Sequence, residues 1–219
     1  MKLFDDEPGA EPNDATPFLP ERPTLDALRD AAAGCRGCHL WRGATQTGFG
    51  EGLKKSTVMF VGEQPGDKED QAGKPFVGPA GKELDKALVE VGIDRREVYV
   101  TNVVKHFKFE ERGRRRIHQT PKRFEMDACR PWLDAELEQV RPEAVVLLGA
   151  TAAKALLGSS FRVTKQRGEL LDSELAPIVS ATIHPSAILR APDVEARSAE
   201  RVGFTEDLRT IAEAIAARG

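Results

Sequence analysis

The chain has 219 residues, a formal net charge of −3, 40% hydrophobic residues and 31% charged residues, values that suit one sizeable α/β domain. The negative charge excludes a protein that binds nucleic acid through positive charge spread over its whole surface, so any such surface must be local. The sequence shows neither an apolar run long enough to span a membrane nor a secretory signal, and we expect a cytoplasmic monomer.

The N-terminal segment is rich in Pro, Asp and Glu and contains little that a core could bury, which predicts a disordered tail over residues 1–22. One domain is expected over residues 23–219. Its first element is a short helix over residues 25–34, which follows Thr24, a typical N-cap residue.

A C-x-x-C pair, Cys35 and Cys38, follows this helix. The third cysteine, Cys129, lies far away in the sequence, and three cysteines do not make a disulfide framework. The spacing therefore indicates a metal or redox site of a cytosolic protein.

The rest of the chain alternates short apolar runs with amphipathic segments. Strands are expected at residues 57–61, 98–101, 144–148 and 177–183, and helices at residues 79–91, 121–139, 151–157 and 204–217. A loop rich in Gly and Pro covers residues 62–78, and a basic loop covers residues 105–123. The alternation predicts an α/β fold: a single domain with a mainly parallel four-stranded central sheet flanked by helices.

In a sheet of this kind, the functional site lies beyond the carboxyl ends of the strands. Three segments follow strand ends in this sequence. Residues 62–66, with the sequence GEQPG, follow the first strand, Asn102 follows the second, and His184 follows the fourth. The rule selects these three segments as the candidate site.

The basic loop contrasts with the negative charge of the whole chain. Residues 105–123 contain eight Lys or Arg and two Glu, which gives a charge of +6. Phosphate binding with salt-sensitive affinity is one use of such a segment, although a run of charges is more often a solvated face. Phe107 and Phe109 are interleaved with the charges, and the loop directly follows the strand of Asn102, so we place it at the rim of the candidate site.

Three motifs at these positions, GEQPGDKEDQAGKPFVGPAG, TNVVKH and HPSAILR, together with the C-x-x-C pair and Cys129, resemble the iron–sulfur uracil-DNA glycosylases of the family 4 type. The resemblance covers about residues 25–217. The first motif is highly specific, HPSA is moderately so, and a lone C-x-x-C is weak. The segment RRRIH at residues 114–118 narrows the resemblance to the UdgX group, which is known for cross-linking itself to the abasic site that it creates.

The resemblance implies that the partner is uracil-containing DNA, either single-stranded or a duplex with a flipped base. Phe76 would stack on the uracil, although it could instead be a core residue. Asn102 would read the base edge, because an amide matches both N3–H and O4, although asparagine at a strand end is more often a turn residue. Glu69 would exclude the methyl group of thymine, or could be a solvated acid. Gln64 is placed with these substrate-binding residues.

Cleavage of the glycosidic bond develops positive charge on the sugar and negative charge on the uracil. The resemblance implies that His184 donates a hydrogen bond to O2 of the uracil, the alternative being a capping or core histidine. Glu63 would position or activate water and stabilise the sugar cation. His118 would attack C1′ and remain attached, although a histidine in a basic loop is more often a phosphate contact. We expect the DNA phosphates to be held by Arg114, Arg115 and Arg116.

The thiolates of Cys35, Cys38 and Cys129 leave a four-ligand site one ligand short. Ordinary members of the family have a cysteine after the TNVVK-like strand, and here His106 takes that position, so the resemblance implies His106 as the fourth ligand. His39 is the rival ligand, disfavoured because adjacent residues seldom reach one metal together. From ligand types alone, zinc would be the commoner choice, whereas the resemblance implies a [4Fe–4S] cluster with a structural role.

Three functions stay open from the sequence. The first is a uracil-DNA glycosylase that captures itself on its product. The second is a glycosylase with ordinary turnover, in which RRRIH only binds phosphate. The third is a catalytically silent DNA-binding module that contains zinc or an iron–sulfur cluster.

Overall fold

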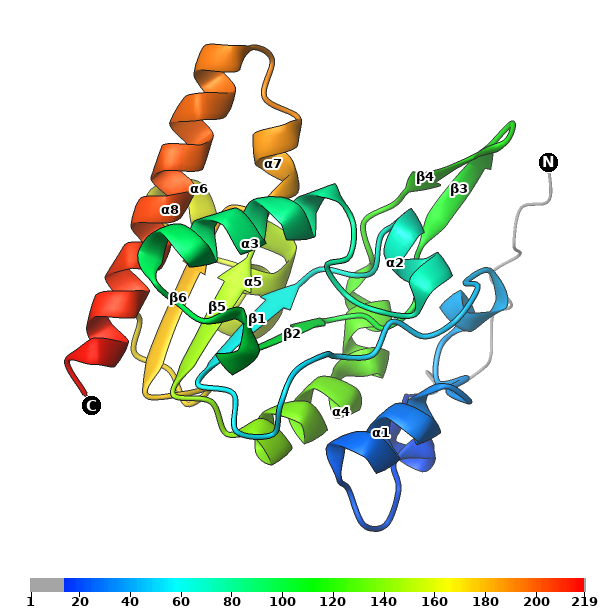
Figure 1. Ribbon diagram of the computed structural model, residues 1–219. Helices are drawn as coiled ribbons and strands as arrows, with labels where there is room; N and C mark the ends of the chain where they lie inside the picture. Colours follow the sequence, from blue (N-terminus) through cyan, green and yellow to red (C-terminus); the bar gives the residue numbers. More distant parts are fainter. Residues whose placement is uncertain (1–13, 219) are drawn as a thin grey trace.

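The computed structural model describes residues 14–218, so the first thirteen residues of the expected tail lie outside the described residues. A parallel sheet with strand order β2-β1-β5-β6 forms the centre (Figure 1). Its strands are β1 (Val58–Gly62), β2 (Val98–Asn102), β5 (Ala144–Leu148) and β6 (Ile178–Thr182), and all their residues are buried. Burial of both faces is typical of a parallel sheet between helical layers. The predicted α/β class and four-stranded sheet are confirmed.

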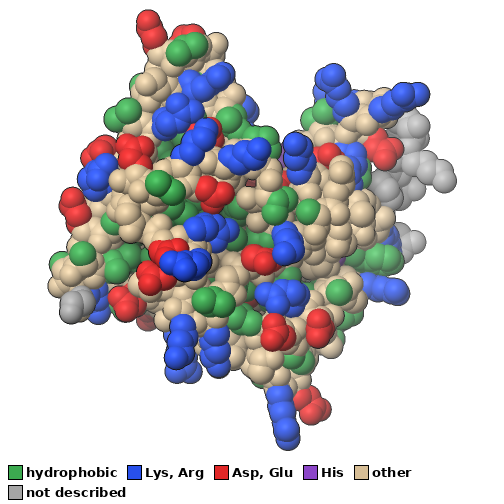
Figure 2. All heavy atoms as spheres, in the orientation of Figure 1, with side chains coloured by type: hydrophobic (Ala, Val, Ile, Leu, Met, Phe, Trp, Pro, Cys, Tyr) green, Lys and Arg blue, Asp and Glu red, His purple; other side chains and the backbone are tan. Residues whose placement is uncertain are grey.

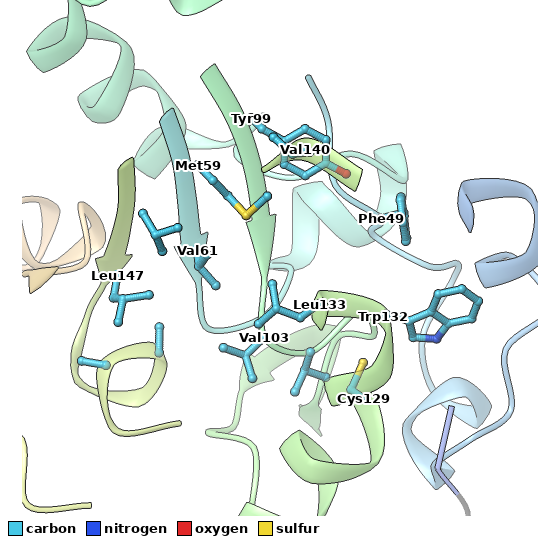
Figure 3. Close-up of a cluster of buried hydrophobic side chains, with 14 of the residues drawn as sticks. Phe49, Met59, Val61, Tyr99, Val103, Cys129, Trp132, Leu133, Val140 and Leu147 are labelled. Atoms are coloured by element: carbon cyan, nitrogen blue, oxygen red, sulfur yellow. The ribbon is translucent and has the colours of Figure 1, made fainter. Parts of the chain in front are cut away.

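Alternate side chains of the strands enter two separate hydrophobic clusters, because successive residues of a strand point to opposite faces. Phe60 and Val100 belong to one cluster, and Met59 and Tyr99 to the other, which Figure 3 shows in close-up. The first cluster is covered by α3 (Pro79–Val91), α7 (Ser186–Leu189) and α8 (Val194–Ala216). The second is covered by α1 (Leu25–Ala32), α4 (Arg123–Val140), α5 (Ala150–Leu157) and α6 (Val163–Gln166).

Two segments predicted as loops contain regular structure. Within the basic loop, β3 (Phe109–Arg112) and β4 (Arg115–His118) form an antiparallel hairpin that projects away from the sheet (Figure 1). Its turn contains Gly113, whose φ of 63° favours glycine. The loop rich in Gly and Pro contains α2 (Asp67–Ala72). Both segments are short and highly charged, so they lack the hydrophobic periodicity on which the prediction depended.

Part of the expected tail contains regular structure. Residues 14–22, expected in the tail, include the turn η1 (Thr16–Phe18), and the buried Ala15 donates its N–H to the carbonyl oxygen of Ala128 at 2.8 Å. The C-terminal helix α8 begins at Val194, ten residues before the predicted start, because the Asp193 side chain caps its first turn. Two further single turns are η2 (His39–Arg42) and η3 (Arg95–Glu97).

Among residues 14–218, no helix combines the length and the apolar character that crossing a membrane requires.

Candidate active site

The carboxyl ends of β1, β2 and β6 bring the three predicted segments to one edge of the sheet. Gly62 and Asn102 are partners in the register of β1 and β2, and β6 ends at Thr182, two residues before His184. The hairpin and α7 stand on either side of this edge (Figure 1). The surface is notched between the hairpin and the corner formed by α7 and α8, and Lys or Arg side chains flank the notch (Figure 2). The site therefore lies where the strand-end rule places it.

Asn102 and Phe76 meet at Gly62. A Cβ atom at residue 62 would collide with Oδ1 of Asn102 and would stand 2.9 Å from Cζ of Phe76, so a side chain there would displace both groups. Phe76 has a φ of 55°, a left-handed conformation that costs a non-glycine residue about 1–3 kcal/mol. Its ring centroid lies 5.9 Å from that of His184, with 31° between the ring planes. An apolar ring, an amide and an imidazole thus lie together at the strand ends.

The position of the proton on His184 follows from Ser186. The Ser186 N–H, which can only donate, lies 3.2 Å from Nδ1 of His184, and the Ser186 hydroxyl lies 2.7 Å from the same atom. Nδ1 is therefore the acceptor, and a neutral ring carries its proton on Nε2. Burial, followed by the charges of Arg190 and His118, lowers the pKa of His184 to about 4. At neutral pH, His184 is an uncharged hydrogen-bond donor through Nε2.

His118 at the end of β4 pairs with Glu63 after β1. Nε2 of His118 lies 3.3 Å from Oε1 of Glu63, an oxygen that is buried and has no hydrogen-bond partner among the described residues. The His118 side chain is 47% exposed and that of Glu63 is 19% exposed, so the imidazole is the more accessible of the two. Its ring also lies beside that of Phe107, with centroids 6.1 Å apart. The pair places a carboxylate and a candidate nucleophile at the mouth of the site.

Gln64 fastens the base of the hairpin. Its Nε2 donates to the carbonyl oxygens of Lys108 and Gln119 at 3.1 and 3.0 Å, and its Oε1 accepts from the Lys108 N–H at 3.0 Å. We expected Gln64 among the substrate-binding residues. Both N–H donors of its amide are instead used inside the protein and the side chain is buried, so its contacts assign it to holding the hairpin.

Arg116, for which we expected a phosphate contact, is also used inside the protein. Its guanidinium pairs with Asp67 at 2.5 Å and with Asp70 at 2.6 Å. It also lies over the rings of Phe107 and Phe109, at 5.5 and 5.0 Å from their centroids. Because Asp70 is fully buried, these contacts tie the middle of β4 to α2 and leave Arg116 little freedom to follow a phosphate.

Arg114 and Arg115 differ from their neighbour. Both are exposed near the tip of the hairpin and make no ion pair with the described residues. Their expected role in phosphate binding is compatible with this placement.

Glu69 accepts a hydrogen bond from the Gly78 N–H at 2.8 Å and thereby closes the loop that carries Phe76. Its expected role against the thymine methyl group stays a prediction.

The three cysteines lie where the segment after α1 packs against α4. Sγ of Cys35 accepts a hydrogen bond from Nε1 of Trp132, and Sγ of Cys129 accepts one from the N–H of Lys105, both at 3.2 Å. Burial, with a smaller effect of charge on the neighbouring cysteines, raises the pKa of Cys38 to about 11 and that of Cys129 to about 12. Donors aimed at sulfur stabilise the thiolate, which is the form that binds metals.

Among residues 14–218, no group of three His, Cys, Asp or Glu side chains is close enough to hold one metal ion. The expected rival ligand, His39, is already partnered. Its Nε2 lies 3.2 Å from the buried carboxylate of Glu125, and its ring lies beside that of Phe124. The cysteines therefore do not form a closed single-ion site with His39 or with His106 in this arrangement.

His106 is joined to the segment of Cys35 through Thr47. The Thr47 hydroxyl donates to the carbonyl oxygen of Ala32 at 2.8 Å, and the same oxygen accepts from the Cys35 N–H at 3.0 Å. Nε2 of His106 lies 3.2 Å from the Thr47 hydroxyl oxygen. Because the hydroxyl proton is engaged by Ala32, Nε2 of His106 is the donor and Nδ1 keeps its lone pair. Burial lowers the pKa of His106 to about 4, so the ring is neutral at neutral pH.

Sequence reasoning missed one buried polar group next to the site, an ion pair between Lys105 and Glu136 with a distance of 2.5 Å. Lys105 stands in a run of basic residues, and Glu136 stands among other charged residues of α4. Neither position carries a local signal that separates it from a solvated charge. The one available signal is that Lys105 follows Asn102, the last residue of its strand, by only three residues.

Comparison with known proteins finds a matching family model and several similar enzymes. The family model of the Uracil DNA glycosylase superfamily matches residues 49–209 of the chain. A type-4 uracil-DNA glycosylase of Thermotoga maritima is 37% identical over 174 residues, which cover 79% of this chain and 87% of that protein. The type-4 enzyme of Saccharolobus solfataricus is 33% identical over 202 residues, with 89% and 88% covered. That of Sulfurisphaera tokodaii is 36% identical over 179 residues, with 78% of each chain covered.

Proposed function

This chain belongs to the uracil-DNA glycosylase superfamily, and we propose that it excises uracil from DNA and then stays bound through His118 to C1′ of the abasic site. The observation that carries the second step is the 3.3 Å separation between Nε2 of His118 and Oε1 of Glu63, beside Asn102 and His184 at the strand ends. An imidazole held at a reaction centre competes with water, because a fixed geometry makes its attack effectively unimolecular.

Recognition of the base begins when uracil leaves the base stack and enters the notch at the strand ends. We assign Phe76 as the wall on which the base stacks and Asn102 as the reader of N3–H and O4. Cytosine presents the opposite order of donor and acceptor, so the same amide disfavours it. The close approach of both side chains at Gly62 supports this assignment. Glu69, which closes the loop of Phe76, is assigned to exclude the thymine methyl group.

Cleavage breaks the bond between C1′ of the sugar and N1 of uracil, and the electron pair of that bond leaves with the base. His184 assists by donating its Nε2–H to O2, where negative charge develops. Its low pKa and its contacts with Ser186 support a neutral donor of fixed orientation. Glu63 acts on the sugar: its carboxylate stabilises the positive charge that develops at C1′.

Capture forms one new bond. A lone pair on the imidazole of His118 attacks C1′ and takes the place of the departed N1. The imidazole then loses its N–H proton, which passes through Glu63 or solvent and neutralises the uracil anion. The linked imidazole is a poor leaving group, so each protein molecule acts once.

DNA binding is assigned to the two exposed arginines of the hairpin, Arg114 and Arg115. They precede His118 by four and three residues in the same hairpin, and we propose that the phosphates on either side of a flipped nucleotide pass along this hairpin. Because a flipped base costs the least when it is unpaired, single-stranded DNA or a duplex that exposes its uracil is the proposed substrate. We propose that the protein acts on DNA as a cytoplasmic monomer.

We further propose that Cys35, Cys38, Cys129 and His106 hold a [4Fe–4S] cluster rather than zinc, the alternative from ligand types, because one zinc ion needs its ligands close around it. The N–H donors aimed at two of the sulfurs and the free Nδ1 lone pair of His106 fit such a group. Each ligand of a cluster binds its own iron, so the four residues need not close around a single ion. When bound, the cluster would supply a structural link between the N-terminal segment and α4.

One denaturing gel separates the proposal from its two rivals. The purified protein is incubated with uracil-containing and uracil-free DNA and is then heated in detergent. The proposal predicts a protein–DNA band that survives denaturation and forms only with uracil. An alkali-labile abasic strand without this band would indicate ordinary turnover and would refute covalent capture. Unchanged DNA that is still bound under native conditions would indicate the silent binding module.

A further inference from the structure

We propose that Lys105 and Glu136 form a buried positioning pair that sets the place of Asn102 and thereby the affinity of the site for uracil, an inference that rests on the proposed function. Neither residue touches the base in this scheme. They act through the main chain of the residue that reads it.

The ammonium group of Lys105 has all three of its N–H groups engaged. Nζ donates to Oγ1 of Thr101 at 2.6 Å, to the carbonyl oxygen of Asn102 at 2.7 Å, and to Oε2 of Glu136 at 2.5 Å. The Lys105 side chain is 1% exposed and the Glu136 side chain is fully buried. Removing two charges from water costs about as much free energy as their attraction returns, so stability alone is a weak reason for such a pair.

The bond to Asn102 acts at the end of β2. Beyond Asn102, the next two N–H groups of the chain donate to the carbonyl oxygens of Gly62 and Glu63, at 2.9 and 3.0 Å. The Lys105 side chain then turns back and caps the Asn102 carbonyl. The main chain around Asn102 is therefore held from one side by the segment of Glu63 and from the other by Lys105. The amide that reads uracil is thus placed relative to the carboxylate that faces the sugar.

Glu136 keeps Lys105 in one position. Besides Lys105, its carboxylate accepts hydrogen bonds from the Tyr99 hydroxyl at 3.0 Å, the Thr101 hydroxyl at 2.8 Å and the Gly50 N–H at 3.0 Å. Figure 3 shows Tyr99 among the buried side chains of this layer. A shift of the carboxylate would break several buried bonds at once, and a buried polar group left unpaired costs about 1–3 kcal/mol. The network therefore fixes the position of the Lys105 ammonium group relative to α4.

The test measures how strongly free uracil inhibits uracil excision, because free uracil binds the pocket without any contact made by the DNA. In the double variant Lys105→Met with Glu136→Gln, both charges are removed, the volume is kept, and the new amide oxygen can still accept from Tyr99 and Gly50. The main-chain N–H of Lys105 that reaches Cys129 is also kept. We expect the inhibition constant for uracil to rise about tenfold, the loss of roughly one well-directed hydrogen bond, while affinity for uracil-free DNA stays unchanged.

Tyr99→Phe is the matched control. It removes a hydrogen bond to the same carboxylate but none to Asn102, so it should lower the melting temperature and leave the inhibition constant for uracil unchanged. An unchanged inhibition constant in the folded double variant, or an equal rise in Tyr99→Phe, would overturn the positioning role. Should the double variant fail to fold, Glu136→Gln alone takes its place. It loosens the hold on Lys105, and an unchanged constant there overturns the proposal equally.

A second readout does not depend on catalysis. The side-chain amide of Asn102 gives its own NMR signals, which should shift or broaden in the double variant and stay in place in Tyr99→Phe. Unmoved signals in the double variant refute the positioning pair even if the protein releases no uracil. A wild-type protein that releases no uracil refutes the proposed function alone. The two failures are therefore distinguished.

Discussion

Nε2 of His118 lies 3.3 Å from Oε1 of Glu63, although the first residue ends an exposed hairpin and the second follows a buried strand. The contacts that bring them together come from their own sequence neighbours. Gln64, next to Glu63, bonds to the base of the hairpin, and Arg116, two residues before His118, pairs with Asp70. The position of the proposed nucleophile is therefore set relative to the carboxylate by adjacent residues.

Replacing Glu63 by Gln is expected to slow uracil release by at least about a hundredfold while the protein stays folded, because a neutral amide of the same shape cannot stabilise positive charge at C1′. The rate is measured in a single turnover as free uracil released from labelled DNA. Circular dichroism and bound iron serve as controls for the fold. A rate within about tenfold of wild type would remove Glu63 from the mechanism.

Arg115 and Arg116 offer a matched pair of variants, since one is exposed and the other is held by Asp67 and Asp70. In Arg115→Gln, the slope of log affinity against log salt concentration should become shallower by about 1, the loss of one phosphate contact. In Arg116→Gln, this slope should stay unchanged, while the yield of cross-link falls because the hairpin has lost its anchor. Fluorescence anisotropy and the denaturing gel measure the two quantities. The same change of slope in both variants would contradict the assignment.

The sheet and the strand-end site could be predicted because their residues carry the local signal. Strands such as Val58–Gly62 are buried on both faces, and they appear in the sequence as uninterrupted apolar runs. The hairpin could not be predicted, because Phe109–Arg112 is largely exposed and charged. Its position depends on Gln64 and Arg116, whose partners lie far away in the sequence.

The buried ion pair shows the same limit. A lysine at position 105 has the same appearance in the sequence whether it is solvated or buried. Only Glu136, which α4 places beneath the end of β2, explains its burial. The uses of Gln64 and Thr47 likewise depend on carbonyl groups of distant segments, for which no residue type gives a signal.

The pKa of His184 predicts how stability changes with pH. Burial lowers this pKa from 6.5 to about 4 in the folded protein. As the pH falls below about 6.5, the unfolded chain takes up a proton that the folded protein refuses until about pH 4, so the contribution of His184 to stability is complete above pH 6.5 and is lost between these values. Urea unfolding at pH 7 and pH 5 should therefore show a smaller loss of stability in His184→Gln than in wild type, by on the order of 1–2 kcal/mol. Equal losses would mean that His184 is not buried as a neutral ring.

Metal content tests the ligand assignment. His106→Ala should lose iron, whereas His39→Ala should keep it, because His39 is already partnered by Glu125. His106→Cys should keep the cluster by restoring a fourth thiolate. Iron, sulfide and zinc are measured per protein together with visible absorbance. Full iron content in purified His106→Ala would refute the assignment, and zinc in place of iron would favour the alternative metal.

Thr47 should matter only when residue 106 is a histidine. Thr47→Val removes the oxygen that accepts from Nε2 of His106 and should therefore lower the iron content of the wild-type background. Thr47→Ser keeps the hydroxyl and should keep the iron. In His106→Cys, a thiolate needs no partner to fix a tautomer, so adding Thr47→Val should have little effect. Equal iron loss in both backgrounds would show that Thr47 only stabilises the fold.

His118→Ala tests the central step. Once uracil has left, C1′ is an electrophile that either the imidazole or water can attack. Without the imidazole, water has no competitor, so the variant should form no denaturant-resistant band on uracil-containing DNA. It should still release uracil and leave an abasic product, because Glu63, Asn102 and His184 are unchanged. With no covalent product to trap the protein, more than one equivalent of uracil should be released per molecule.

The partner of His118 makes this result specific. Glu63→Gln is expected to lose release and cross-link together, since no electrophile forms, whereas His118→Ala separates the two. Uracil release and cross-link yield, measured on the same samples, therefore place the two residues on successive steps. A cross-link at full yield in His118→Ala would identify another nucleophile and would end the role proposed for the hairpin. Loss of release in both variants would mean that His118 acts before the glycosidic bond breaks, with Glu63 as its partner in cleavage rather than in capture.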